Sequence, residues 1–320
     1  MEISEEIINN RYNTDIYINN PDKISNIEIL HKLNIKNDEP FFSIIIPICN
    51  QESIIVKHIK SILDKTTEKD HELILIIDCC SDRTEENITS WINNIGSELH
   101  NYKLLTNILV LKSTIPLFEV AADNLGFFCS RGKYCLEIQA DMEMTDEGYN
   151  MRLLQPFILN KDIIAISGRC AHDFTCQKGG IGKIGFDISI QVKDLPNVDA
   201  NYYYIGETCN RGPLLFDKEK LKTLKYLDEV NFFLENDEHD LFARAYVEHG
   251  WLCGYVPIDF ISLIENGTTR KKRDALNQEY YEKFCIQTKN HNGFIYINMC
   301  IILNLEILPC TNYIKIDHYY

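Results

Sequence analysis

Short apolar runs alternate with amphipathic stretches between residues 41 and 140, and this alternation limits the folds that the chain can adopt. The first run, residues 41–48 ("FFSIIIPI"), is aromatic and β-branched, as expected of a strand buried on both faces of a parallel sheet. In residues 53–65, four aliphatic residues follow at helical spacing: Ile55, Ile59, Ile62 and Leu63. Strand and helix in succession predict an α/β fold with a mostly parallel central sheet and right-handed crossovers.

The same alternation continues along the chain. We expect strands at residues 72–80, 109–111 and 133–140, and helices at residues 85–91 and 120–130. Ligands of such sheets bind beyond the carboxyl ends of the strands. Polar and acidic residues follow three of the predicted strands, at positions 47–52, 78–82 and 141–143, so these positions are the first candidates for a binding site.

The segments on either side of this pattern differ from it. Residues 1–40 are polar, rich in Asn and weakly periodic, and they end in "KNDEP", which is typical of a linker. We therefore predict an N-terminal extension (1–40), a main domain (41–265) and a C-terminal extension (266–320).

Charge and cysteine content narrow the classes of partner. The 320 residues include 32 Lys and Arg against 47 Asp and Glu, a net charge of −15, which disfavours nucleic acid and anionic membranes as partners. A small molecule or a neutral glycan fits better. The 12 cysteines form no compact framework, no signal sequence begins the chain, and no apolar run reaches the ~20 residues of a membrane span. We expect a soluble, cytoplasmic protein without a transmembrane segment.

The residues at the strand ends limit how the chain could bind a phosphate group. The glycine-rich motifs G-x-G-x-x-G and G-x-x-x-x-G-K-[ST] do not follow the predicted strands. A divalent cation held by carboxylates is another way to bind a diphosphate. Asp141 and Glu143, in "IQADMEM", would face the same side if the strand continued through them. An acidic strand end without a ligand is the alternative.

Five segments in order resemble family 2 glycosyltransferases of the GT-A fold, over about residues 41–255. They are "SIIIPICNQE" (43–52), "ELILIIDCCSDRT" (72–84), "AADNLGFFCSRGKYCLEIQAD" (121–141), "CNRGPLLFDKEKLKTLKYLDE" (209–229) and "DEHDLFAR" (237–244). The resemblance implies a Rossmann-like sheet with a nucleotide-binding half (41–145) and an acceptor half (146–265). It also implies sugar transfer from a nucleotide-diphosphate sugar, with a UDP-sugar as the expected donor and a glycan or glycoconjugate as acceptor.

By this resemblance, the nucleotide-sugar site contains seven residues: Pro47, Asn50, Glu52, Asp78, Asn124, Gln139 and Asp141. Asp141 and Glu143 are the expected ligands of Mn²⁺ or Mg²⁺, and the loop Arg211-Gly212-Pro213 belongs to the acceptor side. Three positions depart from the family pattern, because Cys79 and Gln139 stand where acidic residues are usual and Asp123 stands where Arg is frequent.

A catalytic base is expected in the acidic cluster at residues 235–240. Inverting transfer needs a carboxylate that takes the proton of the acceptor hydroxyl. The family pattern aligns this base with Glu238 and leaves Asp237 as the second candidate. A structural reading is also open: Asp237 as the N-cap of a helix over residues 241–249, with Asp240 stabilised by the helix dipole.

Other features keep more than one interpretation. Cys170, His172 and Cys176 suggest zinc, but buried core cysteines explain them as well, since a second C-x₂-C pair is missing. Tyr202 to Tyr204 fit a packed strand or a surface that stacks on a sugar. The basic run Arg270 to Arg273 fits a segment that folds over the diphosphate, a solvated patch or a nuclear import signal.

For the whole chain, the alternatives to a metal-dependent inverting glycosyltransferase are an inactive protein of this fold that binds sugar nucleotides and a sugar-1-phosphate nucleotidyltransferase. The second would need a glycine-rich loop after the first strand, where "PICNQE" stands.

Overall fold

A computed structural model describes residues 26–172, 183–186, 201–234, 236–263, 265, 267, 278–279 and 281–282, and the backbone of 313–315. The chain divides into two compact units. The N-terminal unit consists of residues 15–151 and 259–274, and the C-terminal unit of residues 1–14, 152–258 and 275–320. Cys176 and the basic run 270–273 lie outside the described residues.

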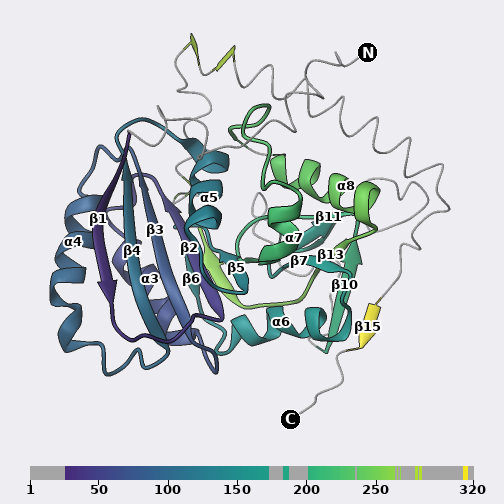
Figure 1. The fold of residues 1–320 in the computed structure, drawn as a ribbon, viewed down its shortest axis with the longest axis horizontal. Coiled ribbons are helices and arrows are strands. Elements are labelled where there is room, and N and C mark those ends of the chain that lie inside the picture. Colours follow the sequence, from purple (N-terminus) through teal and green to yellow (C-terminus); the bar gives the residue numbers. More distant parts are fainter. Residues whose placement is uncertain are drawn as a thin grey trace. The chain divides into compact units, whose positions relative to one another are not determined.

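The N-terminal unit contains five neighbouring strands in the order β1-β4-β3-β2-β5 (Figure 1). They are β1 (Ile27–Asn34), β2 (Phe42–Ile48), β3 (His71–Asp78), β4 (Leu105–Ser113) and β5 (Tyr134–Glu137). The last four are parallel, as predicted, whereas β1 runs antiparallel to β4. β1 falls within the predicted N-terminal extension. The third predicted strand is longer than expected, because β4 pairs on both edges.

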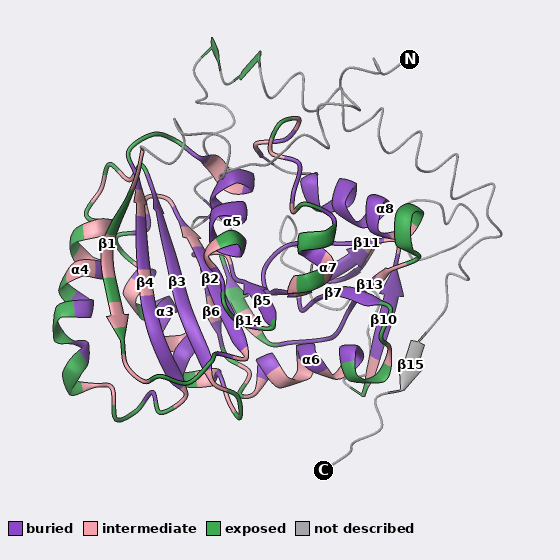
Figure 2. Ribbon diagram, in the orientation of Figure 1, coloured by how far each residue is buried: buried purple, intermediate pink, exposed green. Residues whose placement is uncertain are grey.

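Three helices connect the parallel strands: α3 (Ile55–Lys65), α4 (Thr84–Asn94), which continues into the short 3₁₀ helix η1 (Ile95–Ser97), and α5 (Phe118–Cys129). Helix α3 buries the four aliphatic residues whose spacing predicted it. Helix α5 lies very close to the sheet at Gly126, where an added Cβ would come within 2.3 Å of the Ile45 side chain. Figure 2 shows that these strands and the inner side of α5 are buried.

The order of the strands reverses at β2. The chain steps outward from β2 to β3 and β4, and α5 then returns it to the other side of β2, where β5 pairs. Open α/β sheets bind ligands at such a switch point, beyond the carboxyl ends of the strands. The loop after β2 and the turn after β5 flank this point.

The turn after β5 corrects one expectation. Strand β5 ends at Glu137, and the Met142 amide donates a hydrogen bond of 3.0 Å to the Gln139 carbonyl, which closes a turn. A separate short strand, β6 (Met142–Met144), then pairs antiparallel with β14 (Phe260–Ser262). The strand does not continue through Asp141 and Glu143, so strand alternation cannot place their carboxylates on one side.

The C-terminal unit contains strands in the order β12-β7-β13-β10-β15: β12 (Leu214–Asp217), β7 (Ile163–Ser167), β13 (Leu252–Tyr255), β10 (Tyr202–Gly206) and β15 (Tyr313–Lys315). Only the β7–β13 pair among these is parallel in the described residues. A smaller sheet has the order β11-β8-β9, formed by β11 (Thr208–Cys209), β8 (Cys170–His172) and β9 (Lys183–Gly185).

Three further helices complete the described structure: α6 (Tyr149–Leu159), α7 (Lys218–Thr223) and α8 (Asp237–His249). The expected N-cap of α8 is wrong by one position. Asn236, with a left-handed φ of 66°, is the N-cap, and Asp237 is the first helical residue. The helix ends at Gly250, also left-handed, whose amide donates to the Tyr246 carbonyl at 2.8 Å.

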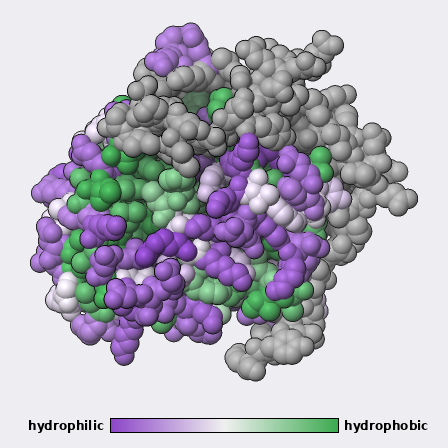
Figure 3. Space-filling model, in the orientation of Figure 1, coloured by the Kyte–Doolittle hydropathy of each residue, from purple (hydrophilic) through white to green (hydrophobic). Residues whose placement is uncertain are grey.

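The described surface is mixed in polarity. On the face of the N-terminal unit that Figure 3 shows, apolar side chains gather in patches among polar ones. Within the described part of the chain, no helix combines the length and the apolar character needed to cross a membrane.

Candidate active site

The loops after β2 and β3 are joined by hydrogen bonds. The Asn50 side-chain oxygen accepts from the Ser81 amide at 2.8 Å, and the Glu52 carboxylate accepts from the Arg83 amide at 2.8 Å. In return, the Glu52 amide donates to the Asp82 carboxylate at 3.0 Å. Asn50 and Glu52 therefore join the two loops, and Pro47 is half-buried near the end of β2.

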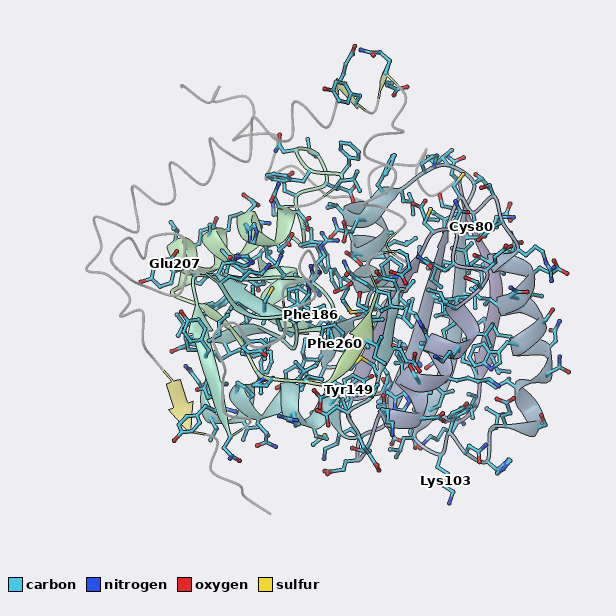
Figure 4. The ribbon with its side chains drawn as sticks, turned by 180° about the vertical axis from the view of Figure 1, so that it is seen from behind. Cys80, Lys103, Tyr149, Phe186, Glu207 and Phe260 are labelled. Carbon is cyan, nitrogen blue, oxygen red and sulfur yellow. The ribbon has the colours of Figure 1, made fainter. Side chains whose placement is uncertain are left out.

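Cys80 lies between these two loops. Its thiol donates to the Ile48 carbonyl at 3.5 Å and accepts from the Asn50 amide at 3.2 Å. The hydrogen-bonded thiol of Cys49 and burial raise the pKa of Cys80. Figure 4 shows Cys80 and Lys103 at opposite ends of the N-terminal unit. The predicted nucleotide site belongs to the end with Cys80.

The Asp78 carboxylate binds backbone amides at the N-terminus of α5. One of its carboxylate oxygens accepts from the Leu117 amide at 2.7 Å, and the other accepts from the Phe118 amide at 2.9 Å. Phe118 has a left-handed φ of 60°, so this carboxylate secures a turn that ordinary residues rarely adopt. The structure thus gives Asp78 a role in the fold, and its contact with a nucleotide stays a prediction. Asn124 is buried inside α5.

The turn after β5 contains the buried carboxylate of Asp141. The hydroxyl of Ser262 in β14 donates to it at 3.4 Å, and His58 of α3 contacts the adjacent Ala140 carbonyl through Nδ1 at 2.9 Å. Burial lowers the pKa of His58. Contacts from both α3 and β14 therefore fix the turn that presents Asp141.

Two neighbouring residues have partners of their own. The side-chain amide of Gln139 donates to the Glu119 carboxylate at 3.0 Å, and Glu143 accepts from Lys57 at 2.6 Å. Glu119 brings a carboxylate beside the position where the family usually has an acidic residue. The sequence motifs did not predict a role for Glu119. The feature that could have indicated it is an acidic residue in the first turn of the helix before the motif.

The chemistry of this turn fits a divalent cation. Mg²⁺ and comparable ions are frequently held by one or two carboxylates together with substrate phosphates, rather than by a complete protein cage. Asp141 is such a carboxylate, whereas the Lys57–Glu143 ion pair would have to open before Glu143 could assist. Among the described residues, no three His, Cys, Asp or Glu side chains form a cluster suited to a metal.

In the C-terminal unit, Arg211 and Asp237 form an ion pair away from solvent. The side chains of Arg211 and Asp237 are 4% and 0% exposed, and a guanidinium nitrogen donates to the Asp237 carboxylate. Because removal of either partner would leave a buried charge, we assign the pair a structural role.

Glu238, the next residue on α8, has a different environment. Its Oε1 accepts from the Asn210 amide at 3.3 Å, while Oε2 lies 3.9 Å from Nε of Arg211. Within the described chain, no group donates a hydrogen bond to Oε2. Oε2 is therefore the oxygen of this carboxylate that the described residues leave without a hydrogen bond.

The loop that carries these partners is anchored to β7. The Ser167 hydroxyl donates to the Asn210 carbonyl at 2.7 Å, and the Gly168 amide donates to the Pro213 carbonyl at 2.8 Å. Gly212 has a left-handed φ of 58° and precedes a cis proline. The predicted acceptor loop thus shapes the surroundings of Asp237 and Glu238.

Two residues that suggested zinc converge on the same loop. His172 contacts the Asn210 side-chain oxygen through Nε2, and the Cys170 thiol donates to that oxygen at 3.2 Å. The His172 ring also lies against the His239 ring, with centroids 5.5 Å apart. Burial, reinforced by His239, lowers the pKa of His172 to about 4.

Comparisons with known proteins match part of this chain. Residues 43–178 match the model of glycosyl transferase family 2. Dolichyl-phosphate beta-glucosyltransferase of Dictyostelium discoideum is 27% identical over 194 residues, 54% of this chain and 57% of that protein. The chain thus spans little more than half the length of this relative.

Two solved structures resemble the fold. Mannosyltransferase PcManGT from Pyrobaculum calidifontis, in complex with GDP-mannose and Mn²⁺, has a TM-score of 0.52 at 14% identity, over 86% of this chain and 78% of that one. GalNAc-T7 with UDP, GalNAc and Mn²⁺ has a TM-score of 0.51 at 16% identity, over 70% and 43%. These likenesses confirm the predicted GT-A architecture. Residues 43–178 thus match glycosyl transferase family 2, and the described fold is that of GT-A glycosyltransferases.

Proposed function

We propose that this protein is a metal-dependent inverting glycosyltransferase that moves a sugar from a nucleotide-diphosphate sugar to a hydroxyl acceptor. A UDP-sugar is the donor that we expect, and a glycan or glycoconjugate in polysaccharide biosynthesis is the acceptor. The observation that carries the proposal is the state of Glu238, a carboxylate with one oxygen hydrogen-bonded and the other without a donor among the described residues.

The donor would bind beyond the strand ends of the N-terminal unit. The loops with Asn50 and Glu52 are already ordered by each other, so binding costs little further ordering. Asp141 would hold Mn²⁺ or Mg²⁺, and such an ion stabilises the departing diphosphate. Gln139, with its amide bound to Glu119, orients groups near the donor without adding a charge.

Glu238 would take the proton of the acceptor hydroxyl as the new bond forms. Asp237 is the weaker candidate, because its charge is already used by Arg211 in a buried pair. Proton transfer to Asp237 would leave Arg211 as a buried charge without compensation.

The test is transfer by Glu238→Gln, with Glu248→Gln as control, since Glu248 lies on the same helix at its exposed end. We expect Glu238→Gln to lower kcat by about 10²- to 10⁴-fold, the usual contribution of acid–base catalysis, with donor affinity unchanged. Transfer would be measured with a panel of UDP- and GDP-sugars and Mn²⁺. Near-normal turnover of the variant would remove Glu238 from the mechanism.

A second acceptor class is favoured by the relative from Dictyostelium discoideum, whose name specifies dolichyl phosphate. A phosphate acceptor is ionised at neutral pH and gives up no hydroxyl proton when it attacks. Transfer to a polyprenyl phosphate would therefore survive Glu238→Gln, whereas transfer to a sugar hydroxyl would not. An inactive protein that binds sugar nucleotides would instead bind donor without any transfer above background.

A further inference from the structure

We propose that Asn210 is a positioning residue that holds Glu238 in the orientation of a general base, and that His172 fixes the Asn210 side chain. This inference rests on the proposed function of Glu238. It adds two residues that act through Glu238 and touch neither donor nor acceptor.

The first step is the direction of the Asn210 amide. Its oxygen receives the Cys170 thiol at 3.2 Å and Nε2 of His172, and its nitrogen lies 3.3 Å from Oε1 of Glu238. An amide has an acceptor on one side and a donor on the other. The reversed orientation would set the amide oxygen against the Glu238 carboxylate, which can only accept, so the contact with Glu238 fixes the present orientation.

The second step is the protonation of His172. With a pKa of about 4 the ring is neutral near pH 7, and a neutral imidazole has a single N–H. The contact with the Asn210 oxygen requires that N–H on Nε2. Three other groups influence this ring, namely His239, Lys183 and Glu238. The neutral ring therefore serves as a fixed hydrogen-bond donor.

The third step is the rigidity of Asn210 itself. Its amide N–H donates to the Cys170 carbonyl at 3.0 Å, and its own carbonyl accepts from Ser167 at 2.7 Å. The neighbouring strand β11 pairs with β8, which carries both Cys170 and His172. Strand β8 thus holds both the backbone and the side chain of Asn210, and Ser167 of β7 holds its carbonyl, so Glu238 receives a hydrogen bond from a fixed direction.

The hydrogen bond from Asn210 bears on which oxygen of Glu238 takes the proton. The hydrogen bond to Oε1 occupies one oxygen and favours one rotamer, which leaves Oε2 as the oxygen that would take the proton. A base held in this way gains rate from its orientation. Loss of the hydrogen bond should reduce kcat and leave the KM for donor unchanged, because the predicted donor residues belong to the N-terminal unit.

The experiment compares steady-state transfer by the wild type, Asn210→Leu, Asn210→Asp, His172→Leu and His172→Gln, with the exposed Asn93→Leu on α4 as control. We expect Asn210→Leu and His172→Leu to lower kcat about tenfold, the worth of one hydrogen bond, with donor KM changed less than twofold. His172→Gln should recover most of the activity, since its amide N–H can replace that of Nε2. Asn210→Asp should move the acid limb of the kcat–pH profile to higher pH, because two neighbouring carboxylates repel each other and favour a protonated form.

A double variant separates this inference from the proposed function. If Asn210 acts through Glu238, then Asn210→Leu combined with Glu238→Gln is no slower than Glu238→Gln alone. Multiplicative losses, an unmoved acid limb or a failure of His172→Gln to recover activity would overturn the positioning role while Glu238 stays the base. A Glu238→Gln enzyme with normal turnover would overturn both. Should Asn210→Leu not fold, Asn210→Asp and His172→Gln decide the matter.

Discussion

Some buried carboxylates of the N-terminal unit have fixed hydrogen-bond donors as partners. Glu72 in β3 is the clearest case: one carboxylate oxygen accepts from the Ser43 hydroxyl and the Arg131 amide, each at 2.6 Å. The other oxygen accepts from Asn107 and from the Arg131 guanidinium, each at 3.0 Å. The apolar run around Glu72 predicts that it is buried, but its partners lie 29 to 59 residues away from it and cannot be predicted from a local pattern.

His71 provides a pH prediction at the same scale. Burial lowers the pKa of His71 from 6.5 to about 4. Between these two pH values, His71 is protonated in the unfolded chain and neutral in the folded chain. Stability is therefore unaffected by His71 above pH 6.5 and falls as the pH decreases towards 4, by at most ~3 kcal/mol. We expect His71→Asn to flatten this decline in urea denaturation between pH 7 and 4.5. His100→Asn, at an exposed position, should follow the wild type, and a parallel decline of His71→Asn would contradict the prediction.

Helix α5 links the fold to the site, since it covers β2 and β3 and begins at the turn secured by Asp78. Its existence was predictable from periodicity. Its closeness to the sheet was not, because that depends on Gly126 facing Ile45 and Ile76 across the helix–sheet contact. The turn after β5 was equally hidden, since β6 pairs with a strand more than a hundred residues later.

Gly126→Ala tests the contact of α5 with the sheet. The added methyl group would meet the Ile45 side chain at 2.3 Å, so we expect a loss of about 1–2 kcal/mol in the free energy of unfolding, because overpacking outweighs the ~1 kcal/mol gain in helix propensity. Urea denaturation measures the change. Gly96→Ala is the control, because no atom lies within 4 Å of its added Cβ. Equal stability of the two variants would refute the close packing.

At the scale of the whole molecule, the predicted site residues are divided between the two units. The predicted donor and metal residues all belong to the N-terminal unit, and the base and acceptor loop belong to the C-terminal unit. The order of the sequence motifs predicted the GT-A fold and the resemblance to family 2 glycosyltransferases. It could not distinguish Asp237 from Glu238, since Arg211 lies within ion-pair distance of both carboxylates and only the structure shows that it donates a hydrogen bond to Asp237.

At the same scale, we predict that the stability of the nucleotide complex and sugar transfer both depend on a divalent cation. We expect Mn²⁺ to raise the melting temperature in the presence of UDP, and EDTA to abolish both this shift and transfer. Asp141→Asn should lose the Mn²⁺-dependent shift and keep the melting temperature of the free protein.

Glu143→Gln is the companion variant. If the ion pair with Lys57 is the only role of Glu143, the shift survives, whereas its loss would assign Glu143 to the metal. An enzyme indifferent to EDTA would refute metal dependence.

The antiparallel strand β1 has a practical consequence for work with fragments of this chain. It covers the outer edge of β4 along Ile27 to Asn34, and its own outward positions include the charged Glu28 and Lys32. A fragment that begins at Phe41 would leave the backbone of β4 without this cover. Uncovered strands of a parallel sheet pair readily with other chains. Such a fragment would tend to aggregate, although every predicted site residue would still be present.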